Sequence, residues 1–256
     1  MLLHGQILNL DRTIEADSVN MSKKIKLAAL LGASFYTFQQ TTGFINEALN
    51  YDVTNYLPKD HILVLSGKYN ITTSEGAIIQ NLGYIHLRYR DNDTRKLSLE
   101  PFTQYQWNTT IGLIQRYLIG CNLRVRIFEN AKADIYYGVG AMFENEDWNY
   151  KGVTDYALIP ANAPPLVIDN FYKTNQYLKA SISISNSCDI VTAVFLQNKI
   201  DDLINSYRLS NYTTISLRVS KKLTFSLSGD ISYDNKPVVP INNTLYTMIS
   251  TLAIKI

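Results

Sequence analysis

The segment GLIQRYLIGCNLRVRIF, residues 112–128, alternates apolar and polar side chains with a period of two residues. Such alternation predicts a β-strand, and about fifteen residues is roughly three times the usual strand length. The fold must therefore accommodate a long strand that is apolar on one side and bears arginines on the other. The apolar phase holds Leu113, Tyr117, Ile119, Cys121, Leu123, Val125 and Ile127, and the polar phase holds Arg116, Asn122, Arg124 and Arg126.

The same two-residue period recurs along most of the chain, whereas helical periodicity is hard to find. For example, Ile85 and Leu87 share one face of a predicted strand, and His86, Arg88 and Arg90 share the other. We expect twelve strands. They span residues 23–38, 44–57, 61–72, 77–90, 96–108, 112–128, 133–147, 171–185, 189–198, 206–220, 222–234 and 244–256.

The connections between these strands fall into two alternating classes. Every second connection is short and charged, and each intervening one is free to be long. This alternation predicts an up-and-down meander with its tight turns at one end, as in bacterial outer-membrane barrels. The expected tight turns are residues 58–60, 91–96, 129–132, 186–189 and 220–222, and the longest connections are 148–170, 199–205 and 235–243.

Strand length favours a membrane barrel over a soluble β-sandwich, whose strands also alternate but need only five or six residues. A barrel strand crosses about 25 Å of apolar band at a tilt and needs about ten residues. We therefore expect an all-β, closed, antiparallel up-and-down transmembrane β-barrel of about 12 strands, with lipid on the apolar face. Aromatic side chains near strand ends fit interfacial girdles: Tyr56, Tyr69, Tyr105, Trp107, Trp148, Tyr233 and Tyr246.

Charged side chains of both signs fall on the phase expected to face the barrel interior. Two interpretations stay open: a plug of ion pairs between neighbouring strands, or a narrow channel whose wall charges select a solute. Because arginines outnumber acids, a channel would favour anions. The expected lumen-lining residues are Arg88, Arg90, Glu100, Arg116, Arg124, Arg126, Asp134, Glu144, Glu146, Arg208, Arg218 and Asp230.

Composition argues against several other functions. The net charge of +2 is too small to indicate a nucleic-acid partner. Cys121 and Cys188 lack metal-ligand spacing, so we expect isolated thiols and no metal or cofactor. Enzymatic activity, such as lipid modification, is the weakest alternative, because His86 falls on the interior face and no Ser–His pair can be assembled on the lipid face.

The beginning of the chain differs from the rest. MLLHGQ lacks the charged start and the full apolar core of a signal peptide. We expect residues 1–21 to be a signal-peptide remnant followed by an N-terminal periplasmic arm, and residues 22–256 to form the barrel. The alternative is a genuine start at Met1 in a soluble protein. An even strand number would place both termini in the periplasm of a Gram-negative envelope.

The connection 148–170 combines rigidity with apolar side chains. Pro160, Pro164 and Pro165 stiffen it, and Leu158, Ile159, Leu166, Val167 and Ile168 are unusual for a free loop. We expect a self-packed loop, a lid, or a docking site for an envelope protein.

Several segments resemble a family of uncharacterised outer-membrane proteins labelled "salt-induced outer membrane protein", in the form found in Bacteroidota. The GxxLRxRxF and FExExW elements look like its core signature, and Cys121 stands where the family usually shows a small residue. The resemblance implies an outer-membrane β-barrel with a signal peptide before the QILN-like segment, but no ligand or activity. The segments are QILNLDRTIEADS (6–18), IHLRYRDNDTRKLSLEPFTQYQWN (85–108), LIGCNLRVRIF (118–128), YYGVGAMFENEDWNY (136–150), IPANAPP (159–165) and KPVVPINNTLYTMISTLAIKI (236–256).

The sequence therefore predicts an integral outer-membrane barrel with a structural or accessory role, as a subunit of an envelope complex, in contact with outer-membrane lipid. The alternatives, in order, are a narrow anion-leaning channel and a lipid-modifying enzyme.

Overall fold

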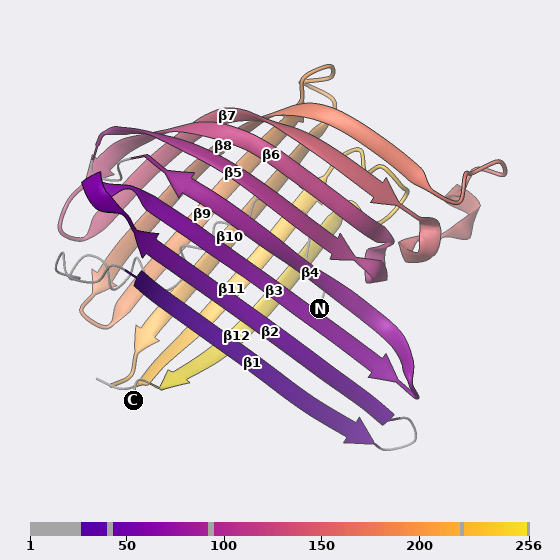
Figure 1. Ribbon diagram of the computed structural model, residues 1–256, viewed down its shortest axis with the longest axis horizontal. Helices are drawn as coiled ribbons and strands as arrows, with labels where there is room; N and C mark the ends of the chain where they lie inside the picture. The colour runs from indigo at the N-terminus through magenta and orange to yellow at the C-terminus, as the bar shows by residue number, and fades with distance from the viewer. Residues whose placement is uncertain (1–26, 40–42, 92–94, 221–222, 255–256) are drawn as a thin grey trace.

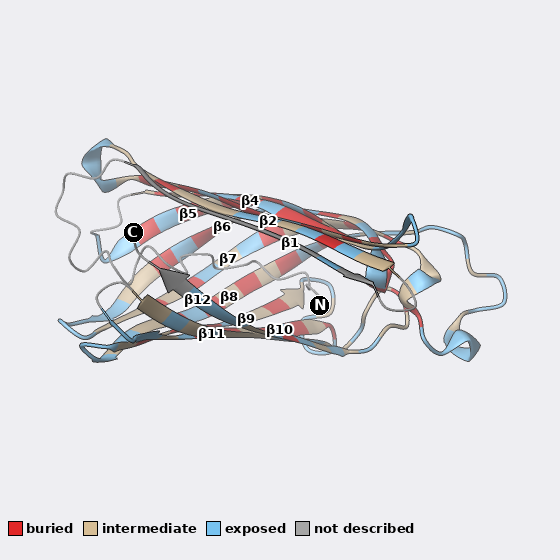
Figure 2. Cartoon of the chain, turned by 90° about the horizontal axis from the view of Figure 1, so that it is seen from below, coloured by how far each residue is buried: buried red, intermediate tan, exposed pale blue. Residues whose placement is uncertain are grey.

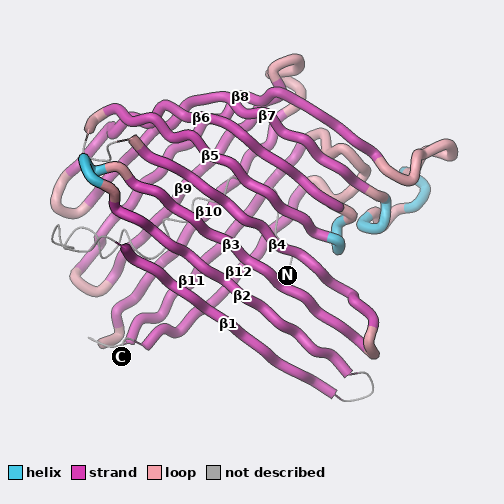
Figure 3. The backbone as a smooth tube through the Cα atoms, viewed as in Figure 1, coloured by secondary structure: helices cyan, strands magenta, loops and turns pink. Residues whose placement is uncertain are grey.

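The computed structural model describes residues 27–39, 43–91, 95–220 and 223–254. Strands dominate this part of the chain, and four short 3₁₀ turns sit in its connections (Figure 3). Within these ranges no helix is both long enough and apolar enough to cross a membrane. The expectation for residues 1–21 lies outside the described residues.

Twelve strands form in the described residues, close to the ranges that the alternation predicts. Most boundaries differ from the expected ones by one to four residues. The strands are β1 (Leu27–Gln39), β2 (Gly43–Tyr56), β3 (Ile62–Ser74), β4 (Ala77–Arg90), β5 (Leu97–Asn108), β6 (Leu113–Glu129), β7 (Ala133–Trp148), β8 (Val167–Ser185), β9 (Cys188–Lys199), β10 (Tyr207–Arg218), β11 (Leu223–Asp234) and β12 (Thr244–Ile254).

These strands form a single sheet in which each strand pairs with the next one along the chain, in the order β1 to β12 (Figure 1). The pairings are antiparallel, for example Leu27 opposite Asn55 in β1–β2 and Leu223 opposite Ile254 in β11–β12. The predicted up-and-down meander is therefore confirmed. Closure of this sheet into a barrel, by pairing of β1 with β12, stays a prediction.

The connections form two ends of different character. At one end β2–β3, β4–β5, β6–β7, β8–β9 and β10–β11 join through short segments, and β1 begins and β12 ends there. At the other end, β3–β4 and β5–β6 also join tightly, but residues 149–166, 200–206 and 235–243 form long loops. The loop expected at 148–170 is shorter than predicted, because Trp148 belongs to β7 and β8 already begins at Val167.

The sheet curls strongly, so that its two halves lie one across the other (Figure 1), and buried residues recur along the strands of both halves (Figure 2). Among the described residues, buried polar and charged side chains outnumber buried hydrophobic ones. Large apolar side chains such as Ile85, Ile119 and Leu123 are exposed on the outer face, whereas Arg88 and Arg124 are buried. The polarity is therefore the reverse of a soluble sandwich, in which charged groups face water.

Two side chains lie on the opposite face from the predicted one. The register of β6 shifts between Leu113 and Gln115, so that Leu113 lies fully buried in the interior instead of on the outer apolar face. A bulge inserts one residue and reverses the alternation beyond it. Trp148, expected in an outer aromatic girdle, is also buried, and its indole N–H donates to Glu146 over 2.8 Å.

Candidate functional site

The predicted lumen-lining residues mostly gather in the interior of the curled sheet. Arg126, Asp134 and Asp230 are only half-buried. Arg218 differs from the prediction: its side chain is exposed beside the short connection that follows β10, where it pairs with Asp189 over 2.7 Å. The buried members are Arg88, Arg90, Glu100, Arg116, Arg124, Glu144, Glu146 and Arg208.

One cluster is centred on Glu100 of β5, nearer the end with the short turns. Arg90 of β4 donates from Nε to Glu100 Oε1 over 2.8 Å, and Arg124 of β6 lies 3.8 Å from the same oxygen. The Tyr177 hydroxyl of β8 donates to Oε2. The guanidinium of Arg124 also stacks 3.5 Å from the centre of the Tyr136 ring. A fully buried carboxylate is stable only with such charge-assisted partners.

A glycine lets Tyr177 reach this cluster. Tyr177 pairs with Gly138 of β7, and a Cβ placed on Gly138 would lie 2.0 Å from the tyrosine ring. The ring therefore lies directly over the backbone of β7, on its way to Glu100. Any larger residue at position 138 would force this ring away.

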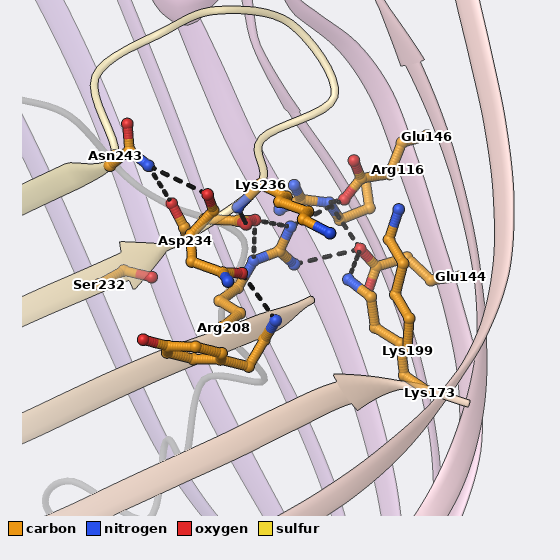
Figure 4. A network of polar contacts seen from close by, with 12 residues as sticks. Arg116, Glu144, Glu146, Lys173, Lys199, Arg208, Ser232, Asp234, Lys236 and Asn243 are labelled. Atoms are coloured by element: carbon orange, nitrogen blue, oxygen red, sulfur yellow. Dashed lines mark hydrogen bonds and ion pairs between the residues drawn. The ribbon is translucent and has the colours of Figure 1, made fainter. Parts of the chain in front are cut away.

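A second and larger cluster lies toward the long loops, with Glu144 and Glu146 of β7 at its centre (Figure 4). Glu146 accepts from Arg116 Nε over 2.5 Å, and Glu144 accepts from Lys173 Nζ over 2.8 Å. Arg208 of β10 donates to both carboxylates, over 3.1 Å to Glu144 and 3.2 Å to Glu146. Its guanidinium also contacts Asp234 of β11 at 2.8 Å. The interactions cross the interior and tie β7 to β10.

An apolar layer lies between the two charged clusters. Its members are inward-facing residues of five consecutive strands, β5 to β9, and all are buried. Along β5, Phe102 follows Glu100 on the same face, and along β7, Met142 precedes Glu144. Side chains thus fill this level of the interior from one side. The layer consists of Phe102, Leu118, Met142, Tyr177, Ala193 and Phe195.

The interior also contains cations that the sequence analysis missed. Lys173 and Lys179 of β8 are buried, and Lys199 of β9 is mostly buried. The pattern was available, because Phe171, Lys173, Asn175, Tyr177 and Lys179 occupy one phase of β8 and all face inward. The prediction for the strand 171–185 did not assign inward and outward faces. It therefore did not place these lysines in the interior.

The loop between β11 and β12 packs over the end of the interior that carries the long loops. Val239 is only 1% exposed and packs with Ile111, Leu113 and Trp148. Val238 and Ile241 pack against the same cluster. Leu113 and Trp148 thus form an apolar seat for residues 235–243.

Loop 149–166 packs in part against residues 109–111, the turn before β6, and the three expectations for it stay predictions. Val153 is buried, and Gly152 lies so close to Ile111 that a Cβ would meet its backbone. Tyr156 and Leu158 remain exposed.

His86 lies on the interior face, as its phase predicts. His86 is buried, lies 3.1 Å from Gln104 and stacks on Phe102. Among the described residues, no group of three or more His, Cys, Asp and Glu side chains could hold a metal ion.

Fold and interior together define a class: an antiparallel up-and-down β-sheet with a charged interior and an apolar outer face. The chain belongs to the family described as "Protein of unknown function, DUF481", whose model matches residues 23–255. No curated protein matches the chain. A solved structure described as the "NanC porin structure in rhombohedral crystal form" is similar, with 10% identity and a TM-score of 0.46, over 89% of this chain and 99% of that chain.

Proposed function

We propose that this protein is an integral β-barrel of the Gram-negative outer membrane, with a structural or accessory role and a closed interior. The reversed polarity of the curled sheet carries the proposal. A long antiparallel sheet with charges inside and apolar side chains outside suits a bilayer, because lipid solvates the outer face and closure pairs all backbone groups.

The outer face supports a lipid environment. Exposed large apolar side chains occur on strand after strand, including Leu49, Leu65, Leu87, Leu99, Ile119, Val139, Leu178, Val194, Ile215, Leu227 and Leu252. Aromatic side chains pack together on the same face: Trp107 lies 5.8 Å from Tyr105 and 6.3 Å from Tyr69, between ring centroids. Such amphipathic rings are typical of membrane interfaces.

The side chains that pack together on the inner side of β5 to β9 favour a closed barrel over an open pore. Arg116, Glu146 and Arg208 reach one another across the interior, and the apolar layer around Phe102 and Phe195 lies beneath them. Transfer of a charged side chain out of water costs on the order of several kcal/mol per ion, so these groups stay paired. We infer that ions find no continuous aqueous path.

Single-channel recording in planar bilayers tests this proposal. Folded, inserted wild-type protein should remain silent. A variant that removes the apolar layer, Phe102→Ala with Phe195→Ala, should conduct, which shows that the assay detects an opened lumen. Wild-type openings that scale with salt would contradict the closed interior, and failure to insert as a heat-modifiable species would contradict the barrel itself.

A narrow anion channel is the second candidate, and the excess of buried cations over buried acids favours it. Small polar side chains on the opposite wall, such as Ser210, Thr214 and Ser232, would leave room for solute there. Anion-selective wild-type currents that weaken in Arg116→Gln would support this alternative. We assign no enzymatic activity, because His86 faces the interior and not the lipid.

We also propose how the barrel is oriented in the outer membrane and where an envelope protein binds it. Both ends of the described sheet lie at the end with the short turns, which in outer-membrane barrels is periplasmic. The long loops would then face outward, and exposed Tyr156 and Leu158 on loop 149–166 would serve as a contact for an envelope protein. Protease accessibility of this loop on intact cells tests the orientation.

A further inference from the structure

Gln176 places a polar amide on the apolar outer face, at the middle of β8. It is the central residue of this 19-residue strand. Its neighbours Asn175 and Tyr177 are buried in the interior, so the pleat of the strand directs Gln176 outward. Val139 of β7 and Leu196 of β9 lie directly opposite it. In the proposed barrel this amide therefore lies near the middle of the apolar band.

Only the oxygen of this amide is hydrogen-bonded. The Tyr137 hydroxyl of β7 donates to Gln176 Oε1 over 3.0 Å. Within the described residues, Nε2 of Gln176 donates no hydrogen bond, and it is not enclosed by the fold. The hydroxyl of Thr174, the preceding outward residue of β8, also has no hydrogen-bond partner in this part of the chain. Lipid hydrocarbon contains no acceptor, so an N–H group without a partner is costly there.

The outward polar side chains of the next two strands, β9 and β10, satisfy one another instead. Asn211 donates to Thr192 Oγ1 over 3.3 Å and to the Ala193 carbonyl over 3.2 Å. Its amide oxygen accepts from Thr213 Oγ1 over 3.1 Å. Both ends of the Asn211 amide are therefore bonded within the chain, whereas the nitrogen of Gln176 is left for another molecule.

Small side chains beside Gln176 allow another surface to approach it closely. Ala141 of β7 pairs with Thr174 of β8, diagonally beside Gln176, and Ala141 is exposed. Bulky rings stand only further toward the long loops, where Phe143 and Tyr172 lie 5.4 Å apart between centroids. Close approach at small residues and hydrogen bonds between amides are two ways in which membrane segments associate.

We propose that two copies of this chain associate in the membrane through the outer face of β7 and β8, with their Gln176 amides paired across a twofold axis. Each Nε2 donates to Oε1 of the other copy. An amide oxygen has two acceptor sites, so Oε1 keeps its bond from Tyr137 as well. The inference rests on the proposed transmembrane barrel.

A second copy is the occupant that suits this face. An amide is both donor and acceptor, so the Gln176 side chain is complementary to itself. Barrels that insert by the same route share one orientation, and a twofold axis along the membrane normal brings identical faces of two such copies together. Lipid tails cannot take the place of the second copy, because they offer the amide nitrogen no acceptor.

Fluorescence energy transfer between donor-labelled and acceptor-labelled protein in lipid vesicles tests the proposal. The dyes are attached at Lys132→Cys, in the exposed turn between β6 and β7, after Cys121→Ala and Cys188→Ala remove the native thiols. We expect transfer that saturates as the protein-to-lipid ratio rises and that falls when unlabelled protein is added. Gln176→Leu should lower the association constant about tenfold, because the amide pair is lost.

Two bulky substitutions at small exposed residues form a matched pair. Ala141→Trp, beside Gln176, holds the two faces apart and should weaken association about as much as Gln176→Leu. Ser250→Trp makes a similar change on the outer face of β12, four strands from β8, and should leave association unchanged. Heat-modifiable migration verifies that each variant is folded.

Three results would overturn the proposal: transfer in inserted wild type no greater than that of randomly distributed barrels, Gln176→Leu that associates as tightly as wild type, or Ser250→Trp that weakens association as much as Ala141→Trp. Wild type that inserts but stays monomeric would leave the barrel itself intact and Gln176 open to a different protein. Wild type that fails to insert would contradict the barrel together with this inference.

Discussion

The hydroxyl of Tyr177 on β8 donates a hydrogen bond to Glu100 on β5, across the two intervening strands. The sequence separation is 77 residues. The bond runs over the backbone of Gly138 and joins the apolar layer to the charged cluster around Glu100. It therefore ties β5 to β8 within one side of the curved wall.

Removal of this bond should destabilise the fold measurably. Tyr177→Phe keeps the ring but leaves a buried Glu100 oxygen without its donor. Hydrogen bonds to charged groups contribute about 1.5–3 kcal/mol, and we expect a loss of that size in the free energy of unfolding, measured by urea titration in lipid bilayers. Tyr105→Phe, on the outer face, is the control and should change it little. Equal effects of the two substitutions would contradict the role of Tyr177.

The assignment of faces predicts the effect of a charge on the outer wall. Ile119 is exposed on the outer face of β6, so Ile119→Arg places a charge in lipid, at a cost of about 2–4 kcal/mol near the midplane. We expect loss of the heat-modifiable folded band after refolding into bilayers. Ile204→Arg makes the same change in an exposed loop residue and should fold normally. Normal folding of Ile119→Arg would mean that this face does not contact lipid.

The seat of the β11–β12 loop gives a third prediction. Val239 is buried against Leu113 and Trp148, so Val239→Asp places an unpaired carboxylate in an apolar cluster near Glu146. The loop should detach, and proteinase K should then cleave within residues 235–243, detected by mass spectrometry of cleaved protein in vesicles. Val219→Asp, at an exposed position beyond β10, is the matched control. A loop that stays resistant in Val239→Asp would show that this packing does not hold it.

The contact between two long loops should depend on pH. Hydrogen bonds from Lys236 and Asn205 lower the pKa of Asp202 below its usual value. Because the folded pKa is depressed, the stabilisation is present above the unfolded pKa and is lost as pH falls through the folded pKa. We expect faster amide exchange of residues 200–206 at acid pH, after correction for intrinsic rates. Asp202→Asn should remove this contribution, and an unchanged pH dependence in the variant would refute it.

The two-residue period predicted most of the strands and faces, because the pleat of a strand leaves no other arrangement once one side is apolar. Arg88, Glu100 and Glu146 were placed in the interior from their phase alone. The order of the strands followed from the alternation of tight and long connections, since neighbouring antiparallel strands need only a short turn. The same reasoning applied to β8 would have found Lys173 and Lys179.

What the chain determined by itself is local: alternation fixes which side chains share a face, and turn residues fix where strands end. What only the tertiary structure decided is which inward groups meet. Residues 235–243 of a distant loop complete the burial of Leu113 and Trp148. The pairing of Arg208 with Glu144, and of Tyr177 with Glu100, depends on the curvature of the sheet. Curvature sums small twists over many strands, so no short stretch of sequence contains it.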